Sequence, residues 1–293
     1  MQKNQFAMPT ESALYFFGPF PNEDVSTNLT PITEMSSLQI SHELSNKRLL
    51  DYTLGYTMWD WEAKIYEALG PHEHIRTLIG LVHCPEKDQD SPWFLKVEKA
   101  PHGYLRDRIT QGDAPPMATR MRMVRDLAET VQHIHSRKVI WGAISPQHIL
   151  LFDNFHIKVS GFGGSCRDDR LFANSYEQDR LSNVVFRCDF RYENPRPYSA
   201  TVLEREMFML GTCICEITEW AIPYGEIDDG KVLMKVIEGE YPHVSEDNPA
   251  KGVIEKLWHF KYSSAQEVSD DIRKLVDQMN AEDREMDQEW EKL

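Results

Sequence analysis

Two histidine pairs are the first candidates for chemistry in this 293-residue sequence. His72 and His74 are separated by one residue, and His133 and His135 have the same spacing. Imidazole binds zinc well, but a zinc site usually takes three or four protein ligands. Neither pair has a nearby cysteine or carboxylate placed as an obvious third ligand. We therefore expect exposed or capping histidines here, and we predict no metal site.

The cysteines could also bind a metal or form disulfides, and the sequence favours neither. Their number is small and odd, which does not suit a disulfide framework. Cys213 and Cys215 fall inside an apolar helical pattern, so we expect two small buried hydrophobic side chains rather than a metal clamp. Reduced thiols indicate a cytoplasmic or nuclear protein. The five are Cys84, Cys166, Cys188, Cys213 and Cys215.

The composition is that of an ordinary globular protein, with 41% hydrophobic and 27% charged residues. The net charge of −15 argues against nucleic acid or an anionic membrane as the main partner, because phosphate binding needs clustered Lys and Arg. The longest apolar runs fall far short of the ~20 residues that span a bilayer. The N-terminus has no basic stretch followed by an apolar stretch and a cleavage site, so we expect no secretion signal.

The C-terminal segment 265–293 is strongly acidic. It holds ten Asp or Glu and four Lys or Arg residues, which gives −6 of the net −15. A solvated helix face would account for this charge, and so would a docking surface for a basic partner. We assign residues 281–293 to an acidic C-terminal helix.

The elements that must position these side chains change in type near residue 100. Residues 12–43 alternate apolar stretches with Pro, Asn and Gly, which indicates a strand-rich region. Met58–His72 has the apolar spacing of a helix that Gly70-Pro71 would end. Residues 75–84 and 92–100 then read as two strands.

After Pro101 the pattern becomes helical. Residues 115–136 have a helical apolar stripe, and residues 204–220 are apolar on nearly all sides, as in a buried central helix. A strand pair, HILLF and HIKVS, lies between them. Further helices follow within residues 230–279. The sequence therefore predicts an α+β protein, with a small strand-rich part followed by a larger helical part.

Motifs in the same order resemble those of the protein kinase superfamily. VIWGAISPQHILL (Val139–Leu151) resembles a catalytic loop of the form V-I-H-G-D-I-S-P-x-N-x-L-L. IKVSGFGGS resembles the strand that leads to D-F-G, and EREMFMLGTCICEITEWAIPYGE resembles the central C-lobe helix. The resemblance, to fungal serine/threonine kinase-like proteins, covers about residues 58–280. It implies a bilobal kinase-like fold, with a flexible segment 1–12, an N-lobe 13–100 and a C-lobe 101–280.

In the same alignment, the positions that carry catalysis in active kinases are occupied by other residues. There, a loop aspartate accepts the substrate proton, and an asparagine five residues later holds magnesium. Ala143 and His148 stand at these positions, and Gly161 replaces the magnesium-binding aspartate of D-F-G. Trp141 replaces the histidine that opens the loop. Ser145 takes the place of a phosphate-contacting lysine, as is usual in the H-G-D-I-S-P group.

The N-lobe also departs from the nucleotide-binding pattern. Between residues 12 and 40, where a glycine-rich loop should lie, only Gly18 occurs. Glu62 matches the glutamate of the N-lobe helix, and it is either an exposed residue or one half of a retained ion pair. Its lysine partner would fall at His42 in the best strand match, or at Lys47 in a poorer one.

Some groups near the implied cleft could still bind a ligand. The hinge around Glu98 and Ala100 can offer backbone hydrogen bonds to an adenine. Asp153, Asp168 and Asp169 could bind a metal in a rearranged site, although aspartates are common in loops. Without the magnesium ligands and the glycine-rich loop, we expect binding of ATP and magnesium to be absent or weak. The usual A-P-E motif is missing, and Tyr192-Glu193-Asn194-Pro195 stands there.

These features predict a catalytically inactive pseudokinase that acts through contacts with a protein partner. The apolar positions survive while the polar working groups are lost, as expected when the fold matters and phosphoryl transfer does not. Two alternatives stay open. One is an atypical nucleotide-dependent transferase that uses other carboxylates, and the other is a weak serine/threonine kinase.

Overall fold

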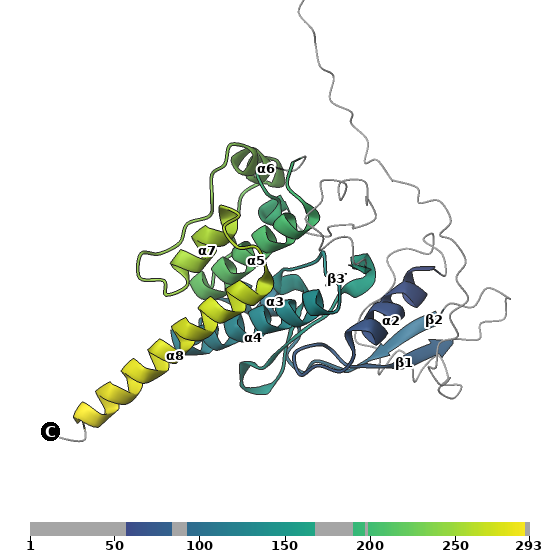
Figure 1. Ribbon diagram of the computed structural model, residues 1–293, viewed down its shortest axis with the longest axis horizontal. Coiled ribbons are helices and arrows are strands. Elements are labelled where there is room, and N and C mark those ends of the chain that lie inside the picture. The colour runs from purple at the N-terminus through teal and green to yellow at the C-terminus, as the bar shows by residue number, and fades with distance from the viewer. Residues whose placement is uncertain (1–56, 84–92, 168–189, 197–198, 291–293) are drawn as a thin grey trace, which may run out of the picture. The chain divides into compact units, whose positions relative to one another are not determined.

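The computed structural model describes residues 57–83, 93–167, 190–196 and 199–290 (Figure 1). The expected strand-rich region 12–43 lies outside these residues, as do Gly18, His42 and Lys47. The N-lobe is therefore described from its helix onward. The domain boundaries stay predictions.

One helix and one strand pair form the described part of the N-lobe (Figure 1). In the helix, Ile65 and Leu69 lie one turn apart and are both buried. Gly70 ends it at φ +68°, a conformation that glycine adopts without strain. The two strands pair antiparallel, and the helix lies against them. These elements are α2 (Thr57–Leu69), β1 (Leu78–His83) and β2 (Trp93–Val97).

Helices dominate the C-lobe, as the apolar periodicity predicts. Helix α4 packs along α8, and α5 packs against α7 and α4. Short α3 was not predicted, because Leu105 and Ile109 are its only buried residues. The helices are α3 (Leu105–Gln111), α4 (Met117–Ser136), α5 (Val202–Glu219), α6 (Asp229–Ile237), α7 (Lys251–Trp258) and α8 (Ala265–Trp290).

Short strands and 3-10 turns hold the segment between α4 and α5. The predicted pair HILLF and HIKVS forms the antiparallel strands β4 and β5, and β3 pairs with β6. The strands are β3 (Val139–Ile140), β4 (Ile149–Leu151), β5 (Ile157–Val159) and β6 (Cys166–Arg167). The turns are η1 (Pro146–His148), η2 (Asp153–Phe155), η3 (Phe162–Gly164) and η6 (Phe190–Tyr192).

Helix α5 is the centre of the C-lobe core. Thr201 and Glu204 cap its first turn reciprocally, each side chain accepting the other's backbone N–H. Cys213 and Cys215 are buried within it, as expected of small hydrophobic side chains. At Gly211 a Cβ would lie 2.8 Å from the Leu257 Cβ, so only glycine lets α5 approach α7 this closely. The core therefore depends on apolar fit along α5.

The C-terminal acidic segment is continuous with α8. The helix runs from Ala265 to Trp290 without a break, so residues 281–290 are its last turns rather than a separate element (Figure 1). None of the helices in the described part of the chain is both long and apolar enough to cross a membrane.

Candidate functional site

The loop that resembles a catalytic loop is anchored to α5 through the backbone of Trp141. Trp141 N donates to Glu206 Oε1 at 2.9 Å, and the indole Nε1 donates to the Ser160 carbonyl at 2.9 Å. Both Trp141 and Glu206 are fully buried. No motif in the sequence singles out Glu206. An acidic residue within the mainly apolar run 204–220 was the available signal.

Three buried aromatic side chains pack against one another between α2 and the loop. The Phe162 ring lies 5.9 Å from Trp141 and 5.1 Å from Tyr66, which meets it edge-on. Such arrangements favour aromatic pairs by about 0.5–1.5 kcal/mol beyond burial. Trp141, at the position that the resemblance matches to a kinase histidine, therefore fills space in a packed column that joins α2 to the loop.

Glu62 belongs to the same buried region. Only 5% of its surface is exposed, and Oε1 accepts a hydrogen bond from Phe162 N at 3.1 Å. The reading of Glu62 as an exposed helix residue was wrong. The candidate lysine positions His42 and Lys47 lie outside the described residues, so the ion pair stays a prediction.

The replaced catalytic positions lie close together. Gly161 has φ +84°, and a Cβ placed on it would come within 2.7 Å of His148 Nδ1. The His148 carbonyl also accepts from Ser160 N at 2.9 Å. Positions 148 and 161 thus face each other, as two residues sharing an ion in an active kinase would.

Ala143 and Ser145 are buried beneath this contact. Ala143 is 1% exposed and packs in the main apolar cluster. The Ser145 side chain is equally buried, and its hydroxyl has no hydrogen-bond partner among the described residues. Neither side chain is presented to solvent in a cleft.

Charged residues surround the hinge. The Glu98 carbonyl accepts from Arg76 Nε at 2.7 Å, and its carboxylate accepts from Lys158 Nζ at 2.9 Å and from Thr77 N at 3.2 Å. Burial alone would raise the pKa of Glu98, but the hydrogen bonds from Lys158 and Thr77 outweigh it and hold that pKa below its ordinary value. Ala100, the other hinge candidate, is half-buried.

The histidine pairs are structural. The His72 ring stacks on His133 at 4.4 Å, and His133 Nε2 hydrogen-bonds the Leu69 carbonyl at 2.9 Å, which caps the end of α2. His135 Nε2 lies 3.4 Å from Glu206 in the core. The expectation was exposed or capping histidines: His133 does cap α2, but the expectation of exposure is wrong, because these rings are half-buried or buried at the junction of α2 and α4. Among the described residues, no group of three or more His, Cys, Asp or Glu could hold a metal ion.

The loop aspartates do not form a described metal site. Asp153 is exposed and pairs with His102 Nε2 at 2.8 Å. Asp168 and Asp169 lie outside the described residues. The described residues therefore give no observation in favour of a rearranged metal site built on these aspartates.

A buried ionic cluster lies where the A-P-E motif would end its segment. Arg106 of α3 donates through Nη2 to Glu216 Oε2 of α5 at 2.8 Å, and the Tyr192 hydroxyl donates to the same carboxylate. Glu216 is fully buried. Burial, and then the Glu216 charge, raises the pKa of Tyr192 well above its ordinary value. The cluster ties η6 and α3 to the core helix.

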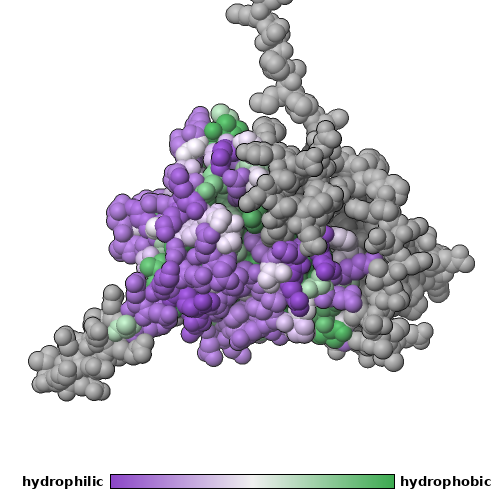
Figure 2. Space-filling view, in the orientation of Figure 1, coloured by the Kyte–Doolittle hydropathy of each residue, from purple (hydrophilic) through white to green (hydrophobic). Residues whose placement is uncertain are grey.

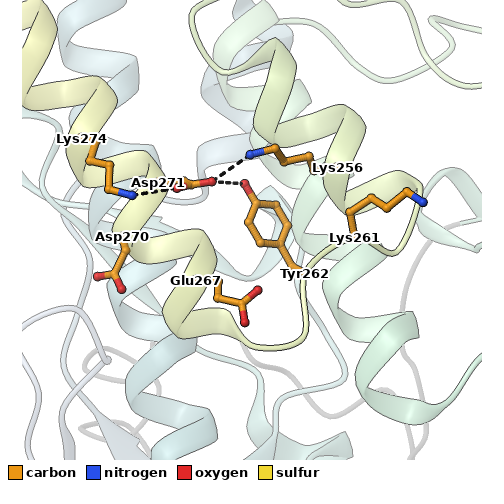
Figure 3. Close-up of a pocket in the computed structure, with 7 residues that line it drawn as sticks. All are labelled: Lys256, Lys261, Tyr262, Glu267, Asp270, Asp271 and Lys274. Carbon is orange, nitrogen blue, oxygen red and sulfur yellow. Dashed lines mark hydrogen bonds and ion pairs between the residues drawn. The ribbon is translucent and has the colours of Figure 1, made fainter.

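A groove between α7 and α8 is lined by interleaved acids and lysines (Figure 3). Asp271 accepts hydrogen bonds from Tyr262 Oη at 2.8 Å and from Lys256 and Lys274 Nζ at 3.1 Å. These hydrogen bonds lower the pKa of Asp271 to about 2, and the bond from Tyr262 has the largest effect. Because these charges satisfy one another, we assign no ligand to the groove. Its other lining residues are Lys261, Glu267 and Asp270.

The visible surface is mostly hydrophilic, with a hydrophobic patch over α6 (Figure 2). Met234 and Ile237 of α6 are 54% and 55% exposed. Isolated exposed apolar side chains are ordinary on protein surfaces. Met234 and Ile237 are therefore not sufficient evidence for a docking site.

A family model for protein tyrosine and serine/threonine kinases matches residues 56–272. The chain belongs to this family. The predicted kinase-like α+β fold is thereby confirmed, with few strands in the described N-lobe and a helical C-lobe. The match covers the loop, the hinge and α5, and the assignment of positions 143, 148 and 161 to kinase catalytic positions stays a prediction.

Three relatives of this chain are distant in sequence. The mouse phosphorylase b kinase gamma catalytic chain, liver/testis isoform, is 25% identical over 67% of this chain and 48% of its own. Serine/threonine-protein kinase 12 of Arabidopsis thaliana is 25% identical over 70% and 44%. The STE20-related kinase adapter protein strd-1 of Caenorhabditis elegans is 25% identical over 41% and 31%.

The chain spans about half the length of the first two of these relatives. The three come from animals and a plant, so the resemblance to fungal members stays a prediction. Their names include two kinases and one adapter, and this mixture leaves activity to be argued from the site.

Proposed function

We propose that this protein is a pseudokinase, a kinase-fold module that acts by binding another protein and does not transfer phosphate. One observation carries the proposal. The aromatic column of Tyr66, Phe162 and Trp141 is fully packed, while the adjacent positions 148 and 161 hold an imidazole and a hydrogen. Phosphoryl transfer depends on metal ligands and positioned charge at those positions.

The chemistry of the replacements supports inactivity. Magnesium prefers oxygen ligands and near-octahedral geometry, and imidazole suits softer metals. Ala143 offers no group that could accept a proton. The adapter name of one relative agrees with a binding role, although that name describes the relative alone.

The same proposal covers cofactors, partners and location. We propose that nucleotide and magnesium binding are absent or weak, that the partner is a protein rather than nucleic acid or membrane, and that the protein works in the cytoplasm or nucleus. The net charge of −15 supports the exclusion of phosphate-rich partners.

Phosphotransfer is the first test. We expect no ATP turnover above a blank without protein, with magnesium or manganese and with generic protein substrates. The protein should be assayed across two independent purification steps. Turnover that follows the protein through both steps would contradict the proposal.

Partner capture is the second test. The folded protein, used as bait in extract of its own cells, should retain a partner that a variant with a broken core does not. Gly211→Leu is a suitable control, because a side chain there collides with Leu257 and pushes α5 from α7. Equal capture by both proteins would argue against a fold-dependent binding role.

A further inference from the structure

A buried cation contacts the hinge. Arg76 lies two residues before the start of β1 and is only 2% exposed. Its backbone N donates to the Val159 carbonyl at 2.9 Å, and its side-chain Nε donates to the Glu98 carbonyl at 2.7 Å. A guanidinium remains charged at every physiological pH, so this is a permanent positive charge behind the hinge.

The Glu98 carbonyl is held in this arrangement from several sides. Glu98 N donates to the Thr77 carbonyl at 3.0 Å, and the Glu98 carboxylate is fixed by Lys158 of β5. Rotation of the peptide that carries the Glu98 carbonyl would break the bond from Arg76 Nε, while the other bonds hold the rest of Glu98 in place. The carbonyl therefore cannot turn toward a ligand without releasing Arg76.

A purine meets two obstacles at such a hinge. Its exocyclic amino group is a donor and needs a backbone acceptor, and here Arg76 already donates to one of the two lone pairs of the Glu98 carbonyl oxygen and places a positive charge beside the other, which repels a second donor. A buried guanidinium that loses this bond would be left with an unmet donor, which is costly in a low-dielectric interior.

We propose that Arg76 is a built-in occupant of the hinge that takes the place of a purine amino group at the Glu98 carbonyl. The inference deepens the proposed function, on which it rests, by assigning the loss of purine recognition to one residue. It does not involve the positions that hold phosphate or metal.

Adenosine is the suitable probe, because it has no phosphates and needs neither magnesium nor a glycine-rich loop. In the full chain, Arg76→Leu should bind adenosine at least tenfold more tightly than the wild type by calorimetry. Arg76→Met, which keeps an unbranched side chain, should show the same gain. N6,N6-dimethyladenosine has no amino hydrogen to donate and should show none.

Lys158→Met is the matched control. It loosens the Glu98 carboxylate but leaves the bond from Arg76 Nε to the carbonyl, so adenosine affinity should stay at the wild-type value. Folding of each variant is checked by circular dichroism. If neither Arg76 variant folds, the Arg76 Nε–H resonance of the wild type should be protected from exchange and unchanged by adenosine.

Several results would overturn the proposal. These are no gain in a folded Arg76 variant, an equal gain for the dimethylated nucleoside, an equal gain in Lys158→Met, or a saturable shift of the Nε–H resonance in the wild type. None of them bears on phosphotransfer, which depends on positions 143, 148 and 161. Failure here and failure of the proposed function are therefore distinguishable.

Discussion

His148 and Gly161 limit each other, because the ring of one occupies the space that a side chain on the other would need. A Cβ at position 161 would lie 2.7 Å from His148 Nδ1, and Gly161 has φ +84°. Two separate costs follow for any substitution at 161. One is backbone strain in the left-handed region, and the other is displacement of the His148 ring.

Gly161→Asp should therefore lower the free energy of unfolding by about 2–4 kcal/mol, of which strain accounts for about 1–2 kcal/mol. Gly112→Asp is the control, since Gly112 has φ +90° but no described atom within 4 Å of an added Cβ. Adding His148→Ala to Gly161→Asp should recover at least about 0.5 kcal/mol. Urea unfolding measures all three, and equal costs at 161 and 112 would refute the steric part.

The replacements at positions 143, 148 and 161 could be proposed from the sequence because these positions sit inside locally recognisable motifs. Their surroundings could not. Glu206 meets Trp141 from 65 residues away, and Arg76 meets Glu98 from 22 residues away. Ala143 looks like a solvent-facing loop residue in the motif, yet it is buried. Long-range contacts of this kind leave no periodic trace in one sequence.

Among the elements, the link between α3, η6 and α5 depends on one buried carboxylate. Glu216 is fully buried and serves both Arg106 and Tyr192. Glu216→Gln leaves the Arg106 charge unbalanced, so we expect a loss of about 3–5 kcal/mol in unfolding free energy.

The same substitution on the surface provides the comparison. Glu129 of α4 pairs with Arg273 of α8 at 3.1 Å, and both side chains are partly exposed. Glu129→Gln should cost no more than about 1 kcal/mol. Thermal or urea unfolding of the two variants should separate them clearly. Similar losses would mean that the Glu216 cluster contributes no more than a surface pair.

The junction of α2 and α4 should respond to pH through His72. Burial, followed by the nearby His133 and His74, lowers the pKa of His72 below its ordinary value of 6.5, while Glu73 and Glu129 oppose the change. The folded protein then binds the proton less readily than the unfolded chain. The contribution of neutral His72 to the free energy of unfolding is therefore fully present above pH 6.5. It is lost as the pH falls through the folded-state pKa of His72.

His72→Gln tests this, because an amide oxygen can still accept from His74 N but does not titrate. Between pH 7.5 and 5.5 the wild type should lose more unfolding free energy than the variant. Other titrating groups are common to both proteins and cancel in the difference. Parallel pH profiles would exclude a role for the His72 ring.

Long periodic elements were predictable, and short ones were not. The predicted helix Met58–His72 is observed as α2, and the apolar run 204–220 is observed as α5. Their residues repeat at helical spacing over several turns, which outweighs local ambiguity. Helix α3 spans seven residues with two buried positions, too few for periodicity to distinguish it from a turn.

In the molecule as a whole, the packed frame and the phosphate chemistry are separable. The apolar cluster includes Ala143, Trp141 and Phe162, whose side chains contribute buried apolar surface. Restoring charged groups at the cleft therefore need not rebuild an enzyme. Arg76 at the Glu98 carbonyl is a separate obstacle, which acts on purine binding rather than on the phosphate or metal positions.

Combining Ala143→Asp, His148→Asn and Gly161→Asp tests this separation. The new side chains at 148 and 161 should be close enough to share magnesium, since the present residues are in contact. We expect magnesium to raise the melting temperature of the triple variant and not of the wild type. Because Ala143 is buried, we also expect Ala143→Asp to lower the free energy of unfolding by at least about 1 kcal/mol. Phosphotransfer should stay undetectable, because only Gly18 occurs where a glycine-rich loop over the phosphates should lie. Robust transfer would show that the N-lobe already positions ATP, and failure to bind magnesium would count against the loop alignment.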